Sequence, residues 1–145
     1  MARLILLLFG ALISIGAAPS SYAEGQVWQY KTRPQDAGSL LKIQKIEASP
    51  TGTIYHISLI GIHILPGESS VLHHAPVSQQ TLDASVTRRV SDPGTFPDAS
   101  NGIAEWRRAR GGVYTISVAQ IAELISQTLA APQQPQPVRQ SSPVS

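Results

Sequence analysis

The strongest pattern in the chain is a run of apolar and β-branched side chains over residues 53–65, TIYHISLIGIHIL. β-Branched residues favour strands, and apolar positions on both alternating faces predict a central strand that is covered on both sides. Gly61 in its middle predicts a bulge. Residues 49–52, SPTG, have proline and glycine where a type I turn prefers them. Residues 39–48 are therefore expected to form the first arm of a long hairpin, with a change of register within it.

Shorter strand patterns lie on both sides of this hairpin. We expect a strand at residues 27–32, VWQYKT, and a strand at residues 70–74 that returns antiparallel to the long one. Residues 91–102 have the composition of a loop. Residues 104–109 predict a short strand or an irregular edge, and residues 113–116, VYTI, predict a further strand.

Two amphipathic helices are indicated by their capping residues. Ser78 is placed to cap residues 79–90, and Ser117 with Gln120 forms a capping box before a second helix that Pro132 ends. The apolar stripes are Leu82, Val86 and Val90 in the first helix and Ile121, Leu124, Ile125 and Leu129 in the second. The predicted fold is therefore α+β: an antiparallel sheet with a short middle helix and a C-terminal amphipathic helix packed on it.

Residues 1–23 have the pattern of a secretory signal peptide. A basic start precedes the apolar residues 4–15, and the small residues Ser21 and Ala23 occupy the positions that signal peptidase reads. We therefore expect cleavage between Ala23 and Glu24. The alternative is an uncleaved membrane anchor, for which the apolar stretch is shorter than the ~20 residues that a spanning helix needs.

Composition limits what the remaining chain does. Residues 24–131 suit a single domain, and residues 132–145, rich in Pro, Gln and Ser, are expected to be a disordered tail. The chain has no cysteine, so its stability does not depend on disulfides. The mature part keeps ten of the eleven Lys and Arg against all nine Asp and Glu, so its net charge is near +1. We therefore expect a periplasmic or secreted protein without stable membrane insertion, without a cofactor, and without nucleic acid as a partner.

The four histidines are the first candidates for chemistry. His56, His63 and His74 form a candidate metal set, provided that a bulge at Gly61 brings His56 and His63 to one face of the strand. His73 and His74 are adjacent and point to opposite faces. None of the spacings matches a known metal motif, so the alternative is that these histidines are structural members of a sheet.

Nucleophilic catalysis has weaker support in the sequence. His74, Ser78 and Asp83 are the only local trio of the right residue types. The chain contains no G-x-S-x-G elbow, and its carboxylates fall in predicted turns or on a predicted helix surface. No catalytic residue is therefore assigned, and an enzyme is less favoured than a binding protein.

A tryptophan followed by three arginines is the favoured candidate for binding. Trp106, Arg107, Arg108 and Arg110 precede a pair of glycines, and this combination suits a phosphate, an acidic protein loop or a nucleic-acid strand. The alternative is that Trp106 belongs to the core while the arginines form a solvated strand edge that discourages pairing with other chains.

Several ordered motifs between Trp28 and Ile125 carry a resemblance. They are W-x-Y-x-x-R-P, G-x-I-Y-H-I-S, H-A-P-V-S, W-R and G-V-Y-T-I-S-V-A. With them the chain resembles small exported bacterial proteins of unknown function. The resemblance implies export and an α+β domain, and it implies no activity.

Together these observations favour a non-enzymatic module that binds another exported protein, in the manner of an inhibitor or an immunity protein. A histidine-dependent or metal-dependent envelope enzyme is the first alternative. A structural envelope component, whose proline-rich tail reaches a partner or the cell wall, is the second.

Overall fold

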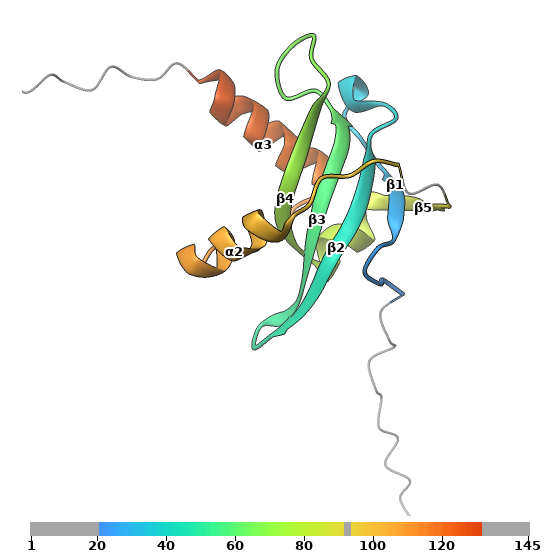
Figure 1. Ribbon diagram of the computed structural model, residues 1–145. Helices are drawn as coiled ribbons and strands as arrows, with labels where there is room; N and C mark the ends of the chain where they lie inside the picture. Colours follow the sequence, from blue (N-terminus) through green and yellow to red (C-terminus); the bar gives the residue numbers. More distant parts are fainter. Residues whose placement is uncertain (1–20, 92–93, 132–145) are drawn as a thin grey trace, which may run out of the picture.

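The computed structural model describes residues 21–91 and 94–131, and the structural statements below concern these residues. Its centre is a five-stranded antiparallel sheet with the strand order β4-β3-β2-β1-β5 (Figure 1). The strands are β1 (Val27–Tyr30), β2 (Leu40–Ser49), β3 (Gly52–Ile62), β4 (Ser70–Ser78) and β5 (Val86–Val90). The helices are the short 3-10 helix η1 (Pro34–Asp36), α1 (Gln79–Ser85), α2 (Ser100–Ala109) and α3 (Val118–Ala130). This is the predicted α+β fold.

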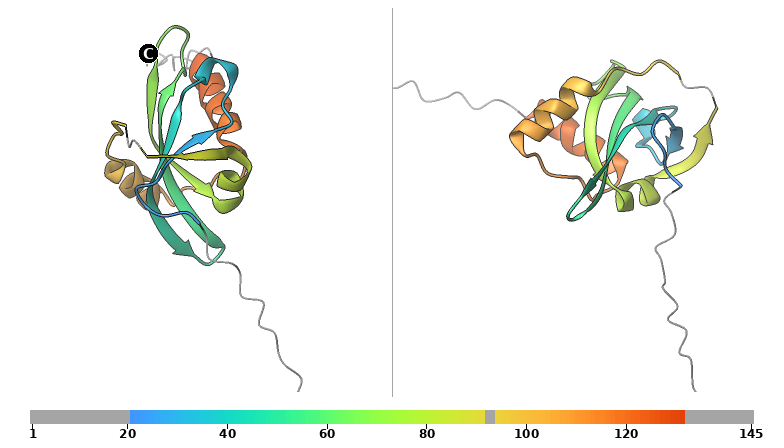
Figure 2. Two further views of the ribbon diagram at one scale, coloured as in Figure 1. Left: turned by 90° about the vertical axis from the view of Figure 1, so that its right-hand side faces the viewer. Right: turned by 60° about the horizontal axis from the view of Figure 1, so that its bottom comes forward.

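The helices cover both faces of the sheet. In the left view of Figure 2, α2 lies on one side of the sheet and α1 and α3 lie on the other. Over residues 21–91 and 94–131, no helix combines the length and the apolar character needed to cross a membrane. The predicted signal segment up to residue 20 and the predicted tail from residue 132 lie outside the described residues.

The main hydrophobic core lies between the sheet and the pair α1 and α3. Tyr55, Ile57 and Leu59 alternate along β3 and are buried on this face. Leu82 of α1 and Ile121 of α3 belong to the same cluster. Burying each such side chain contributes about 1.5–3 kcal/mol, so this face is the main source of hydrophobic stabilisation.

The opposite face of β3 is also buried, but it carries polar groups. His56 and Ser58 are fully buried there, next to Ile54. The Ser58 hydroxyl donates to the carbonyl of His73 at 2.7 Å and accepts from Gln44 Nε2 at 3.0 Å. The long strand is thus covered on both sides, as its sequence predicts, and its buried hydroxyl finds partners on both neighbouring strands.

Both predicted helix caps are present. The Ser78 hydroxyl accepts from Thr81 N at 3.2 Å, and Ser117 forms a capping box with Gln120. Each cap contributes about 1 kcal/mol. The predicted bulge at Gly61 is also present, because the register of β3 against β4 shifts between Ile60 and Ile62.

Several predicted boundaries are wrong, and the strands predicted at residues 27–32 and 53–65 end earlier, at Tyr30 and Ile62. The first helix ends at Ser85 rather than at residue 90, since residues 86–90, VTRRV, are rich in β-branched side chains and pair with β1 as strand β5. The returning strand continues from residue 74 to Ser78. Residues 113–116 form a single bridge, Tyr114 to Val77, rather than a strand.

The segment predicted as a strand at residues 104–109 is helical. Helix α2 begins at Ser100, where the Asp98 carboxylate accepts from both the backbone N and the hydroxyl of Ser100, at 2.9 and 2.6 Å. Ile103 and Trp106 then lie three residues apart on one face. The predicted loop therefore ends earlier than expected, and Asp98 bonds the first residue of the helix.

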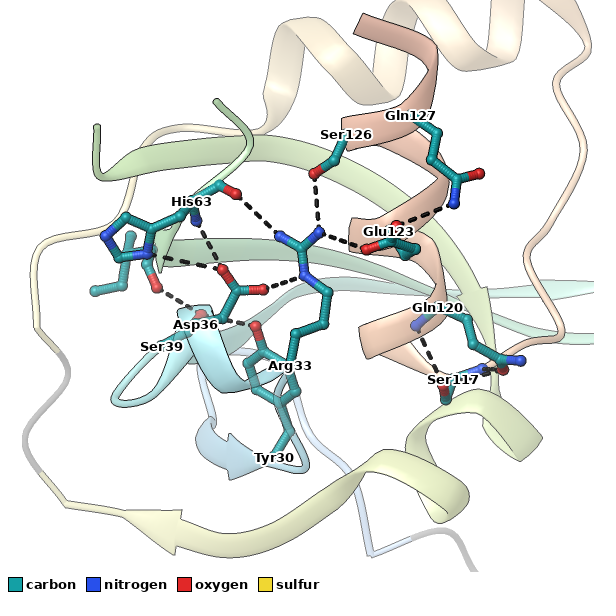
Figure 3. A network of polar contacts seen from close by, with 11 residues as sticks. Tyr30, Arg33, Asp36, Ser39, His63, Ser117, Gln120, Glu123, Ser126 and Gln127 are labelled. Atoms are coloured by element: carbon teal, nitrogen blue, oxygen red, sulfur yellow. Dashed lines mark hydrogen bonds and ion pairs between the residues drawn. The ribbon is translucent and has the colours of Figure 1, made fainter. Parts of the chain in front are cut away.

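A buried ion pair joins three parts of the fold that are distant in sequence (Figure 3). Arg33, 8% exposed, donates from Nε to Asp36 Oδ2 at 2.6 Å, and Asp36 is fully buried. Arg33 also donates to Glu123 and Ser126 of α3, at 3.0 and 2.9 Å, and to the carbonyl of His63 at 3.0 Å. Asp36 Oδ1 accepts from the backbone N of His63 at 2.7 Å. The pair thus holds α3 and the end of β3 against η1.

The substitution Asp36→Asn tests this interaction. It leaves the Arg33 guanidinium buried without its full counter-charge, so we expect a loss of about 3–5 kcal/mol in the free energy of unfolding. Urea denaturation monitored by circular dichroism measures this loss.

The matched control is Glu123→Gln, which removes the other carboxylate that Arg33 contacts. Glu123 is 48% exposed, so solvent screens its ion pair and this change is expected to cost much less than Asp36→Asn. Equal losses for the two variants would show that Asp36 has no special structural role.

Candidate functional site

Two of the predicted histidines meet beneath α2. His56 of β3 and His74 of β4 lie on the same face of the sheet, with His56 Nδ1 2.8 Å from His74 Nε2 and their rings stacked at 5.1 Å. The pairing register explains the contact: His56 pairs with Pro76, and His74 is two residues along β4 from Pro76, so it is the diagonal neighbour of His56.

Glu47 extends this pair into a chain of polar groups. It is the diagonal neighbour of His56 on β2, because His56 pairs with Lys45. Glu47 Oε2 lies 3.5 Å from His56 Nε2, and Glu47 Oε1 forms an ion pair with Arg107 of α2. The order of groups is therefore His74, His56, Glu47 and Arg107, and it connects β4, β3, β2 and α2.

Burial keeps both imidazoles neutral near neutral pH. Loss of solvent lowers the pKa of His56 from its ordinary value, and the charge of Lys45 lowers it further. Burial, with a smaller effect of His56, lowers the pKa of His74 to about 4. The nearby Glu47 carboxylate favours a proton on His56 Nε2, so that His56 Nδ1 accepts the hydrogen bond from His74 Nε2–H.

Trp106 closes this cluster on the side of α2. Its ring meets His56 edge-on, with centroids 5.0 Å apart, and its Nε1 donates to the carbonyl of Gly112 at 2.9 Å. The indole lies so close to Gly111 that a Cβ there would be 2.2 Å from Trp106 Cδ1. Helix α2 also lies close to the sheet at Gly102, where a Cβ would be 2.6 Å from His74 Cβ. Trp106 is thus partly buried and held in one orientation.

The exposed part of Trp106 forms the common wall of two adjoining hollows, which we call the Trp106 groove. One hollow, of about 500 Å³, lies between Trp106 and the tip of the β2–β3 hairpin. The other, of about 420 Å³, lies between Trp106 and Tyr114. The groove is lined by Ser49, Thr51, Ile54, Pro76, Trp106, Arg107, Arg110, Gly111, Gly112, Val113 and Tyr114. Its walls combine apolar surface with two cations.

The three arginines of α2 have different roles. Arg107 pairs with Glu47 at the wall of the groove. Arg108 pairs with Glu105 and is not among the lining residues. Arg110 lines the groove, and its guanidinium has no hydrogen bond or ion pair to any residue that the structure describes. Arg110 is therefore the cation available to a ligand.

The backbone of Arg110 is unusual for an arginine. It ends α2 in the left-handed conformation, with φ +50°, and it is the one non-glycine residue with positive φ in the described chain. Glycine is the usual residue at this position of a helix end, because a Cβ there costs roughly 1–2 kcal/mol. An arginine at such a position, beside a groove, suggests that its side chain is needed for something other than stability.

His63 lies apart from the other two predicted metal ligands. Its imidazole Nδ1 is 3.8 Å from Asp36 Oδ1, in the network around Arg33 rather than under α2. Although the bulge at Gly61 exists, it does not bring His63 to His56. Among residues 21–91 and 94–131, no group of three or more His, Asp or Glu is arranged to hold a metal ion.

The predicted trio of His74, Ser78 and Asp83 has separate structural contacts. Ser78 is the N-cap of α1, Asp83 accepts a hydrogen bond from Tyr22, and His74 bonds to His56. Glu47 was not predicted as a site residue from the sequence. Glu47 lies two residues along β2 from Lys45, the residue opposite His56. This proximity can be recognised only once the register of the hairpin is known.

A further hollow lies at the far edge of the sheet. It measures about 480 Å³, and Gly25, Gln26, Val27, Arg89, Val90 and Ser91 line it. Arg89 is its one charged side chain, and none of the clustered histidines or tryptophan reaches it. The Trp106 groove, where apolar surface, a fixed aromatic ring and an available cation meet, is the stronger candidate.

No family model matches this sequence, and neither a curated protein nor a solved structure matches it.

The lowered pKa values of the histidines predict an acid-sensitive fold. Between pH 6.5 and pH 4, His74 is protonated in the unfolded chain but neutral in the folded one, so the unfolded chain binds more protons. The free energy of unfolding is therefore expected to fall, by about 1–3 kcal/mol from this source, as the pH drops through that interval. Urea denaturation at a series of pH values measures the fall.

The variant His74→Gln should make that part of the profile less steep, because it removes one of the two histidines whose pKa is lowered. His73→Gln is the matched control: His73 is the adjacent, exposed residue of β4, and its replacement should leave the slope unchanged. Identical slopes in all three proteins would show that the stacked pair does not cause the acid sensitivity.

Proposed function

We propose that this protein is a non-enzymatic binding module of the bacterial periplasm or exterior. Its partner is another exported protein, which inserts an extended segment carrying an acidic and an apolar side chain into the Trp106 groove. The single observation that carries the proposal is Arg110: an arginine without an ionic partner in the described chain, held at positive φ beside an apolar groove. The apolar residues 4–15 and the resemblance to exported proteins support the proposed location and the choice of another exported protein as the partner.

The groove has the features of a binding hot spot. Trp106 is fixed by Gly111, by the carbonyl of Gly112 and by the ring of His56, so little conformational freedom is lost when a ligand covers it. Tryptophan and arginine are the residues most enriched at such sites. An apolar side chain fits against Trp106, and a carboxylate fits beside Arg110 through a charge-assisted hydrogen bond.

The polar cluster beneath α2 fits a supporting role. His56 has no exposed surface, and the lining of the groove includes Trp106 and Arg107 but neither His56 nor His74. The chain from His74 to Arg107 then acts as the base that fixes the wall of the groove. A histidine-dependent enzyme is less well supported, because its central imidazole is covered by α2.

The proposal can be tested with a library of random twelve-residue peptides displayed on phage. The wild-type protein is expected to enrich peptides that combine acidic and apolar residues. Affinity for a synthetic copy of the most enriched peptide should fall at least tenfold in Trp106→Ala and in Arg110→Glu, measured by isothermal titration calorimetry. Arg108→Glu is the matched control, since it makes the same charge change on the same helix outside the groove, and it should change the affinity less than about threefold.

Arg110→Gly separates binding from folding. Glycine relieves the positive φ, so we expect this variant to be more stable than the wild type by about 0.5–1 kcal/mol while it binds the peptide at least fivefold more weakly. A library that yields no acidic and apolar preference, or peptides that bind Arg110→Gly as tightly as the wild type, would refute the proposal.

A further inference from the structure

Tyr22 is part of the folded domain, although it precedes the expected cleavage point after Ala23. Its ring packs edge-on against Trp28 at 5.7 Å and against Tyr55 at 5.6 Å between centroids. Its hydroxyl donates to Asp83 Oδ1 of α1 at 2.7 Å. Tyr22 therefore connects β1, β3 and α1, and it packs against the main hydrophobic core.

The residues around Tyr22 are also bound to the sheet. The Ser21 carbonyl accepts from Gln26 Nε2 at 3.3 Å, and Gln26 Oε1 in turn accepts from Trp28 Nε1 at 3.2 Å. On the other side, Glu24 Oε1 accepts from the backbone N of Ile46 at 2.9 Å. The chain thus follows the domain surface from Ser21 onward.

Cleavage after Ala23 would discard the contacts of Ser21 and Tyr22, whereas the bonds of Glu24 and Gln26 to the sheet would remain. A signal peptide is removed during export, so a segment cut off with it is absent from the mature fold. The mature protein would then lose a ring that covers Trp28 and Tyr55 and the donor that bonds Asp83. Aromatic pairs of this kind contribute to stability beyond the area they bury, so a domain that uses Tyr22 is expected to retain it.

We propose that signal peptidase cuts between Ser20 and Ser21, so that the mature chain begins at Ser21. This inference rests on the proposed export. The small residues Ala18 and Ser20 occupy the two positions that the peptidase reads before this bond. A cut after Ala18 would also keep Tyr22, but it places Pro19 directly after the broken bond, where its fixed φ and missing N–H hinder an extended substrate backbone.

The test uses the full-length precursor, expressed in a bacterium and recovered from the envelope fraction. Intact mass and N-terminal sequencing of the mature protein are expected to show Ser21 as its first residue. A mature chain that begins at Glu24 or at Pro19 would overturn the proposal. Retention of Met1 would overturn it together with the proposed signal cleavage, and this outcome is distinct from a failure of peptide binding at the Trp106 groove.

The precursor variant Tyr22→Ala gives an independent readout. If the mature chain begins at Ser21, the substitution appears in its mass and lowers the Tm by about 4–8 °C. Tyr22→Phe keeps both ring contacts and loses the bond to Asp83, so its Tm should fall less. If the cut follows Ala23, both variants yield a mature protein identical to the wild type in mass and Tm, and the proposal fails.

Ser14→Ala is the matched control, since Ser14 lies in the apolar part of the signal segment. This variant should give a mature protein of wild-type mass and Tm. A changed mass in Ser14→Ala would mean that the segment is retained, which contradicts the proposal.

Discussion

The structure depends on one constraint: β3 is buried on both faces, and on one of them it carries polar side chains. A strand with Tyr55, Ile57 and Leu59 on one side needs a hydrophobic cover, which α1 and α3 supply. On the other side, His56 and Ser58 are fully buried and need hydrogen-bond partners, since an unsatisfied buried polar group costs about 1–3 kcal/mol. The position of α2 and the composition of β2 and β4 under it follow from that requirement.

Two kinds of buried polar contact stabilise the fold in different ways. Around Arg33, a full ion pair joins η1 to α3 and to the end of β3, so its contribution depends on complete pairing of a buried charge. Beneath α2, the two imidazoles are kept neutral and bond to each other, so no buried charge needs compensation at that point. The first arrangement holds α3 and the end of β3 against η1, whereas the second supports Trp106, the common wall of the groove.

The sequence predicts the fold class, the central strand, both helix caps and the bulge at Gly61, because each of these depends on local patterns. Prediction from the sequence is wrong where a local preference for one element competes with strand pairing. Residues 86–90 continue a helical stripe, but they are rich in β-branched residues, and their backbone gains hydrogen bonds at the edge of β1. The contact between His56 and His74 and the role of Glu47 depend on strand register, and the difference among the three arginines depends on where α2 ends. None of these has a signal in residue spacing alone.

The order of strands has a consequence for how the chain reaches its final state. Strands β1 to β4 form a meander in which each neighbour follows directly in the sequence, whereas β5 must cross back to pair with β1. Until residues 86–90 are in place, β1 presents an open edge of unpaired backbone groups, and such an edge readily pairs with other chains. Any partly folded chain in which β1 to β4 are paired and β5 is not therefore has its first strand exposed. Strand β5 covers this edge of β1. It carries two arginines, Arg88 and Arg89, and these charges make β5 itself a poor template for further pairing.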